Sequence, residues 1–430
     1  MTVKPVLKKI LWGLAALLLL SALGAFFLLR ASLPKLDGEL ALPGLSQPTV
    51  IERDDNGTVT VRAQNAADSA RALGFVHAQE RYFEMDLLRR SASGELSELF
   101  GKIAIDKDKS IRVHRLRARI QQNYAQMAGS EAATLQAYAD GVNAGLDALS
   151  AKPWPYLLLN TAPEPWKPED SFLVGFAMFF DLQDEDNERE YKLWQLKNVL
   201  PAPIYAMLTQ TRSSWDAPLF GAPDVAVGIP DASQINLNAF DAPQLAYQPN
   251  RLAEAVGSNN FAVSGALTAD GRAIVADDMH LGLRAPNIWF RARLLTGADS
   301  DVSGFTLPGI PSVIVGSNRH VAWGFTNSYG DWADFMRVHW QDAGQTRYLD
   351  GDGKTRNVQV FQETIAVKGG KPVPFTVRET IWGPVTKELN ASYSLALQWA
   401  AQQPGALNMG LNQLATSTDL DSALGIMQRI

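Results

Sequence analysis

The strongest constraint on the fold of this chain is a change of hydrophobic period about halfway along its 430 residues. Before Pro201, apolar residues recur every three or four positions, as on one face of an α-helix. From Phe261 onward, apolar and polar residues alternate in short runs, as in half-buried β-strands. Between them, residues 212–250 are rich in Pro, Ala, Asp, Asn and Gln and show no period. This order of helices, spacer and antiparallel strands predicts an α+β fold.

The periodic segments also give approximate element positions. We expect helices at 66–91, 111–127, 130–149 and 169–199, the last of them broken near Asp184. We expect strands at 261–264, 273–276, 288–293, 312–315, 320–326, 334–340, 358–367, 373–380 and 395–399. Ahead of the first of these helices, Thr49–Arg62 reads as a β-hairpin that turns at Asp55-Asn56-Gly57.

Charge and cysteine content exclude several classes of function. The formal net charge is −6, and no basic run occurs outside the N-terminus, so we expect no nucleic-acid partner. The chain has no cysteine, which rules out disulfides, Cys-ligated zinc, iron–sulfur clusters and a thiol nucleophile. No nucleotide-binding glycine motif, HExxH motif or GxSxG motif is present, and no organic cofactor is expected. Asp350-Gly351-Asp352-Gly353 lacks the later ligands of a calcium loop and is read as a hairpin turn.

The N-terminus has the pattern of a membrane-spanning segment. Three lysines precede an uncharged stretch from Ile10 to Leu29, which Arg30 closes. An apolar helix of this length spans about 30 Å, roughly the thickness of a bilayer core. A retained anchor is favoured over a removed signal sequence, although Ala22-Leu23-Gly24 resembles a cleavage site. The lysines should stay cytoplasmic, which places the rest of an inner-membrane protein on the periplasmic side.

The segment Gly257-Ser258-Asn259-Asn260 lies where the spacer meets the first strand of the second half. Taken alone it is a turn that opens a strand. A strained Gly–Ser bond at this place could instead be cleaved by the Ser258 hydroxyl, which would leave Ser258 with a free α-amino group. Such an amine has a reference pKa of about 7.7–8.0, so it can accept the hydroxyl proton near neutral pH. Cleavage after Gly257 would thus create a nucleophile and its base on one residue.

Several stretches together resemble the penicillin acylase family of N-terminal-nucleophile hydrolases. These are GSNNFAVSG (257–265) with DDMHLGLRAPNIWF (277–290), LGFVHAQERYFEMDLLRRSASGELSELFG (73–101), AYADGVNAGL (137–146), APEPWKPED (162–170) and LPGIPSVIVGSNRHVAWGFTNSYGDWADF (307–335). The resemblance implies an αββα sandwich, cut from one precursor into a helical chain and a β-rich chain. It implies these segments: 1–32 membrane helix, 33–205 helical chain, 206–257 spacer, and 258–430 start of the β-rich chain.

The same resemblance implies an activity and residue roles. The reaction would be hydrolysis of a linear amide of a small N-acyl substrate through an acyl-ester on Ser258. His280 would bond the nucleophile or its amine, and the backbone N–H of Asn327 would face the oxyanion. The acyl pocket would be lined by Leu281, Val315 and Phe325, with aromatic residues near Phe179 and Phe180.

The resemblance also implies a structural calcium ion in part of the family. Asp331, the Ala333 carbonyl and Asp334 would bind it, completed by a carboxylate of the helical chain, Glu188 or Asp186. Carboxylate and carbonyl oxygens are ligands that calcium prefers. A solvated acidic loop is the alternative reading of the same residues.

Two features leave alternatives open. The family's second oxyanion donor, an Asn side chain, and its supporting Arg would fall beyond position 430, and the helical pattern of 416–430 stops without a cap. The chain is therefore expected to be a fragment of an acylase or a truncated, non-catalytic, membrane-anchored binding relative. A third reading is a serine amidase that uses His280 as base without cleavage. The acyl group and the amine stay open among β-lactam side chains, homoserine lactones and other N-acyl compounds.

Overall fold

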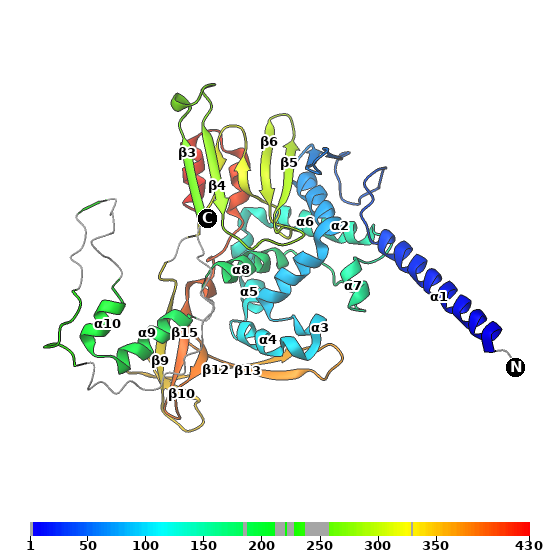
Figure 1. Ribbon diagram of the computed structural model, residues 1–430. Helices are drawn as coiled ribbons and strands as arrows, with labels where there is room; N and C mark the ends of the chain where they lie inside the picture. Colours follow the sequence, from blue (N-terminus) through cyan, green and yellow to red (C-terminus); the bar gives the residue numbers. More distant parts are fainter. Residues whose placement is uncertain (1–2, 184–186, 211–219, 222–227, 237–257, 328–329) are drawn as a thin grey trace.

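Helices fill the first half of the chain and strands fill most of the second, so the predicted α+β organisation is confirmed (Figure 1). The structure is a computed structural model that describes residues 3–183, 187–210, 220–221, 228–236, 258–327 and 330–430. The α-helices are α1 (Val3–Ala31), α2 (Ala66–Ser93), α3 (Ser97–Phe100), α4 (Ile105–Arg112), α5 (Leu116–Ala128), α6 (Ala132–Asp147), α7 (Trp154–Leu158), α8 (Asp170–Leu182), α9 (Glu188–Val199), α10 (Ala202–Leu208) and α11 (Leu420–Met427).

The strands form three sheets. One has the order β1-β2-β5-β6-β7-β8, from Val50–Arg53, Val59–Ala63, Phe290–Thr296, Ser300–Thr306, Val313–Ser317 and Ala322–Trp323. A second has the order β11-β10-β9-β15-β14-β13-β12, from Thr355–Asn357, Arg347–Leu349, Ala333–Trp340, Tyr393–Trp399, Gly383–Glu388, Val373–Thr380 and Gln359–Ile365. The third pairs β3 (Ser258–Val263) with β4 (Ile274–Met279).

The first sheet joins the two halves of the chain. The predicted hairpin forms β1 and β2, and β2 pairs in parallel with β5, from Val59 opposite Ala292 to Ala63 opposite Thr296. Val59 and Ala292 belong to the same buried cluster as Leu73 of α2. The main core therefore lies between this sheet and the helices, and it contains residues from both halves of the sequence.

Helices α2 and α6 approach so closely that their backbones touch. A Cβ atom on Gly141 would lie 1.9 Å from the carbonyl oxygen of Arg71, and one on Gly145 would lie 2.3 Å from that of Phe75. Only glycine fits at such distances, because real Cβ contacts are longer. Helix α2 is capped before its first residue by Asn65, whose side chain accepts a hydrogen bond from Asp68 N–H, and after its last residue by Gly94 with φ 69°.

A buried histidine ties these helices to the first sheet. His77 of α2 is fully buried, with Nδ1 2.7 Å from the Tyr138 hydroxyl of α6 and Nε2 2.9 Å from Oγ1 of Thr306 in β6. The Tyr138 hydroxyl also accepts a hydrogen bond from Gly309 N–H at 2.8 Å. Both ring nitrogens of His77 are thus satisfied, as a buried polar group requires.

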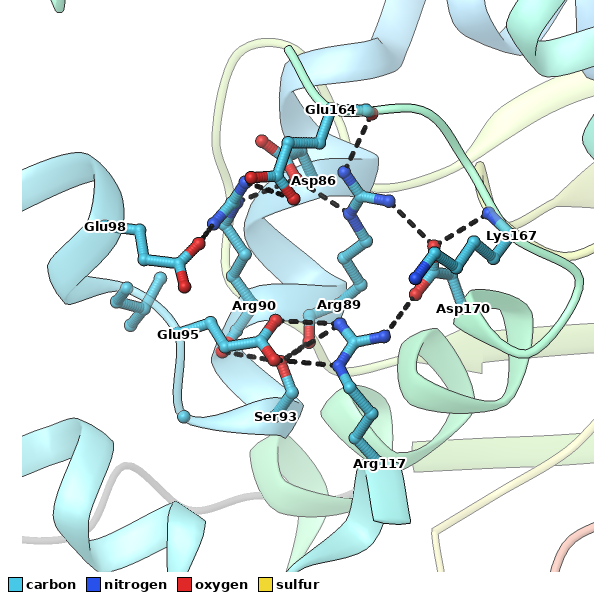
Figure 2. Close-up of polar contacts among 12 residues, drawn as sticks. Asp86, Arg89, Arg90, Ser93, Glu95, Glu98, Arg117, Glu164, Lys167 and Asp170 are labelled. Carbon is cyan, nitrogen blue, oxygen red and sulfur yellow. Dashed lines mark hydrogen bonds and ion pairs between the residues drawn. The ribbon is translucent and has the colours of Figure 1, made fainter. Parts of the chain in front are cut away.

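A second buried polar network holds α2, α5 and α8 together (Figure 2). Arg89 of α2 donates to Asp86 at 2.8 Å and to Asp170 at 2.7 Å. Arg117 of α5 donates to the other Asp170 oxygen at 2.8 Å and makes a two-pronged contact with Glu95, at 2.8 and 2.7 Å. Burial raises the pKa of Glu95, but the hydrogen bonds and charge of Arg117 outweigh it and leave that pKa lowered.

Some predicted elements differ from the observed ones. The helix predicted at 111–127 is interrupted after α4, because Arg115 adopts a left-handed conformation with φ 52° before α5 begins. Strands β6, β10, β11 and β14 were not predicted, whereas the turn at Asp350–Gly353 joins β10 to β11 as expected. The αββα layering and the segment boundaries remain predictions, and most of the spacer, including Gly257, lies outside the described residues.

Helix α1 extends away from the rest of the molecule (Figure 1). Its segment Leu7–Ala31 is long and apolar enough to cross a membrane, and none of its apolar window is buried in the protein. A signal sequence near an N-terminus has the same properties. Both readings of the N-terminus therefore remain.

Candidate active site

A cavity of about 410 Å³ lies between the end of α8 and the strands of the second half. The predicted residues Ser258, Leu281, Val315, Phe325 and Asn327 all line it. Aromatic and aliphatic side chains make up most of the remaining wall, among them Met178, Phe179, Leu182, Trp289, Ile310 and Trp332. Phe180 is not part of the wall and packs on Trp399 instead. The structure thus brings Ser258 together with four predicted residues that lie 23 to 69 positions after it in the sequence.

Ser258 is the first residue of β3, so the strand begins earlier than the predicted Phe261. It lies opposite Met279 of β4, and the following pairs are Asn259 with Asp278 and Asn260 with Asp277. Met279 also lines the cavity. The β3–β4 register therefore places the open end of the hairpin, where Ser258 pairs with Met279, at the cavity wall.

Asp277 holds the loop that contains Phe325 and Asn327. Its Oδ2 accepts a hydrogen bond from Phe325 N–H at 2.9 Å. A Cβ on Gly324 would lie only 2.5 Å from this oxygen, so glycine permits the close approach. In the described part of the chain, the other oxygen of Asp277 is buried without a hydrogen-bond partner. Asp277 was not among the predicted site residues, although it belongs to the stretch 277–290 that carries the family resemblance.

The Asn327 side chain is bound to the helical half. Its Oδ1 accepts from Gln183 Nε2 at 2.7 Å, and its Nδ2 donates to the Leu182 carbonyl at 3.1 Å. Both partners stand at the end of α8. The contacts engage the amide group, whereas the predicted oxyanion donor is the backbone N–H, so they leave that prediction open. They also show that both halves of the chain build the cavity.

His280 is not among the described residues that line the cavity. Its Nε2 lies 3.0 Å from Asp278 Oδ2 and 3.5 Å from Asn259 Nδ2, and the side chain is 43% exposed. The structure therefore places His280 next to Asp278, beside β3. Its role at the nucleophile remains a prediction.

The predicted calcium ligands are only partly brought together. Glu188 forms an ion pair with Lys387, while Asn187 Nδ2 lies 3.2 Å from the Ala333 carbonyl oxygen. Burial raises the pKa of Glu190, and the negative charges of Asp334 and Asp331 raise it further. A hydrogen bond from Asn187 lowers this pKa but does not cancel the rise.

Glu190 is thus the α9 carboxylate near the acidic pair, and Glu188, two positions earlier, faces a different side of the helix. Asp186 lies outside the described residues. Among the residues that are described, no group of three or more acidic or histidine side chains is arranged to hold a metal. They do not form a ready-made metal site, so calcium binding remains a prediction.

Comparison with known proteins settles the family. The penicillin amidase family model matches residues 48–430. This chain belongs to the penicillin amidase family. It is 32% identical to the penicillin acylase 2 proenzyme of Pseudomonas sp. (strain SE83) over an alignment of 372 residues that covers 83% of this chain and 46% of that protein. It is 27% identical to the acyl-homoserine lactone acylase QuiP of Pseudomonas aeruginosa over 413 residues, covering 93% of this chain and 48% of that protein.

A solved structure of a penicillin acylase is also similar to part of this chain. The thermostable penicillin G acylase from Alcaligenes faecalis, in its tetragonal form, superposes with a TM-score of 0.35 and 24% identity, over 41% of this chain and 99% of that one. The chain spans about half the length of the two curated relatives above. Both of these relatives are named as acylases.

Proposed function

We propose that this member of the penicillin amidase family hydrolyses the amide bond of a small N-acyl compound, with Ser258 as nucleophile after cleavage of the Gly257–Ser258 bond. The observation that carries the proposal is the meeting of Ser258, Asn327 and apolar side chains in one cavity. The word proenzyme in the name of one relative fits activation by cleavage.

In the proposed reaction, the Ser258 Oγ attacks the carbonyl carbon of the substrate amide, and its proton passes through a water to the Ser258 α-amino group. The backbone N–H of Asn327 donates a hydrogen bond to the negative oxygen of the tetrahedral intermediate, a contact worth roughly 3–4 kcal/mol in the transition state. Collapse breaks the C–N bond, and the α-ammonium group returns the proton to the leaving amine. Water then hydrolyses the acyl-ester, which releases the acid and restores the Ser258 hydroxyl.

The acyl side of the substrate is proposed to occupy the apolar part of the cavity. Leu281, Val315 and Phe325 belong to its wall together with Trp289. A volume of about 410 Å³ lies in the range of small-molecule sites and suits an acyl chain or an aryl group. Candidate substrates are therefore penicillins and acyl-homoserine lactones, after the names of the relatives.

Cleavage is tested by denaturing electrophoresis and N-terminal sequencing of the purified protein. Two fragments are expected, one of them beginning at Ser258, and Ser258→Ala should give one uncut chain without activity. Ser264→Ala, in the same hairpin but absent from the cavity wall, should be cut normally. Hydrolysis of N-acyl substrates by an uncut chain would refute the proposal in favour of a conventional serine amidase. An uncut chain that binds but never hydrolyses them would favour a binding protein.

Two further parts of the proposal are the membrane anchor and calcium. We propose that α1 tethers the protein in the inner membrane with the rest on the periplasmic side, which protease protection of spheroplasts tests.

For calcium, Glu190 replaces Glu188 as the proposed partner of Asp331, Asp334 and the Ala333 carbonyl. Added Ca²⁺ should raise the melting temperature of the protein and of Glu188→Gln but not of Glu190→Gln. An equal response of all three proteins would reject this ligand set.

A further inference from the structure

The short helix α7 is fixed next to the end of α1. Ala151 N–H donates to the Ala31 carbonyl at 3.0 Å, and α7 begins shortly afterwards at Trp154. Figure 1 shows α7 beside the base of α1, where the long helix meets the rest of the protein. Any membrane that holds α1 would therefore lie close to α7.

Large apolar side chains are exposed on and around α7. Leu158 is 75% exposed, Trp154 is 50% exposed, and Leu33, just after α1, is also exposed. Tryptophan is enriched where proteins meet the membrane–water interface. A cluster of large exposed apolar residues at one place is unusual for a surface that faces only water.

A neighbouring segment adds to the same face through Lys368. The Lys368 side chain donates to the carbonyl oxygen of Leu159, at the end of α7, and its backbone N–H donates to the Ser97 carbonyl at 2.9 Å. The 3₁₀ turn Gly101–Ala104 follows α3 directly and carries Ile103, which is 89% exposed. Ile103 thus belongs to a segment that Lys368 ties to α7.

Basic side chains accompany these apolar ones. Lys102, beside Ile103, and Lys371, in the loop of Lys368, are both exposed. Asp106, an acidic residue of the next turn, lies 3.8 Å from Lys109. Apolar side chains mixed with lysines match the boundary between acyl chains and anionic headgroups.

We propose that Leu33, Ile103, Trp154 and Leu158, with Lys102 and Lys371, form a juxtamembrane face that rests on the phospholipid bilayer entered by α1. This inference rests on the proposed anchor role of α1 and is independent of the proposed hydrolysis. A second contact beside α1 would restrict rotation of the protein about this helix. It would also give the body of the protein one orientation relative to the membrane.

The absence of cysteine from the chain permits a direct test with single labelled cysteines. The full chain is inserted into nanodiscs of phosphatidylglycerol and phosphatidylethanolamine, with or without lipids that carry a nitroxide quencher, placed near the headgroup in one set and midway along the acyl chain in another. A bimane label is attached at Leu158→Cys. Leu18→Cys, within α1, reports insertion, and Leu267→Cys, 81% exposed near the β3–β4 hairpin, is the matched control.

Quenching of the labels at 18 and 158 is expected to exceed that at 267 by several fold. Quenching at 158 no greater than at 267, with strong quenching at 18, would overturn the juxtamembrane face and leave the anchor intact. No quenching at 18 would overturn both. Burial of the label at 158 that depends on protein concentration and not on lipid would show that a second copy covers this face, and would also overturn the proposal.

Discussion

Acidification is expected to destabilise the protein through His77. Burial, reinforced by the positive charge of Arg81, lowers the pKa of His77 from 6.5 to about 3. The neutral ring is held between Tyr138 and Thr306, so protonation in the folded state would break a satisfied pair of contacts. The unfolded chain, with its histidine in water, binds the same proton near pH 6.5.

This difference between the two states makes the free energy of unfolding fall on acidification. Below pH 6.5 the unfolded chain carries a proton on this histidine that the folded chain does not accept until about pH 3, so stability falls across that window. Each pH unit in the window costs about 1.4 kcal/mol of unfolding free energy. The His77 contribution is therefore a loss of about 2 kcal/mol between pH 7.5 and pH 5. The ring is fully buried, so solvent screening does not reduce this figure much.

Urea unfolding in detergent at pH 7.5 and pH 5 measures the effect. The wild type should lose about 2 kcal/mol more on acidification than His77→Asn, whatever the variant costs at pH 7.5. His320→Asn, at an exposed histidine, should keep the wild-type pH dependence. Equal losses in the wild type and His77→Asn would refute the reasoning, because His77 would then not be the group that takes up the proton.

Three further substitutions test other contacts. Gly141→Ala should destabilise the protein by about 1–3 kcal/mol in thermal unfolding, because its Cβ would lie 1.9 Å from the Arg71 carbonyl oxygen. Arg117→Met should cost about 3–5 kcal/mol in urea unfolding, because it removes the close cation of half-buried Glu95 and leaves buried Asp170 with Arg89 alone. Asp277→Ala should lower kcat of the proposed hydrolysis about tenfold and leave cleavage intact, because the loop that carries Asn327 loses a hydrogen bond.

Each of these substitutions has a control in which the same type of residue is replaced at a position that lacks the contact being tested. Gly228→Ala meets no atom within 4 Å, and Arg62→Met breaks an exposed ion pair worth less than about 1 kcal/mol. Asp270→Ala removes a carboxylate of the same hairpin that contacts exposed Arg272. If a control matched its partner substitution in size, the contact named for that partner would not be the cause.

The long helices were predictable because their signals are local. Helix α2 has a helical period, an Asn cap before it and a glycine after it, and all three lie within one segment. Strand β6 was missed because its sequence SDVSGFT has little apolar alternation. Its strand conformation comes from tertiary pairing with β5, which the local sequence does not encode. Strands β10 and β11 have three residues each, which is too short for a period.

The part of the candidate site that lies within recognisable family stretches was predictable from the sequence. The family stretches pointed to Ser258, Asn327 and three pocket residues, and the fold places all of them around one cavity. The roles of Asp277 and Glu190 depend on contacts between distant segments, which the spacing of residues does not contain. The pairing of His280 with Asp278 depends on where the hairpin β3–β4 directs the ring.

The parallel pairing of β2 with β5 has a consequence for any cut at Gly257. One of these strands precedes that bond and the other follows it, and they share a continuous ladder of hydrogen bonds. The two pieces would stay associated through this shared sheet after cleavage and would co-elute from any column run without denaturant. An affinity tag on either piece would retrieve both, and mixing pieces that had been expressed separately would not be equivalent to cutting the folded precursor.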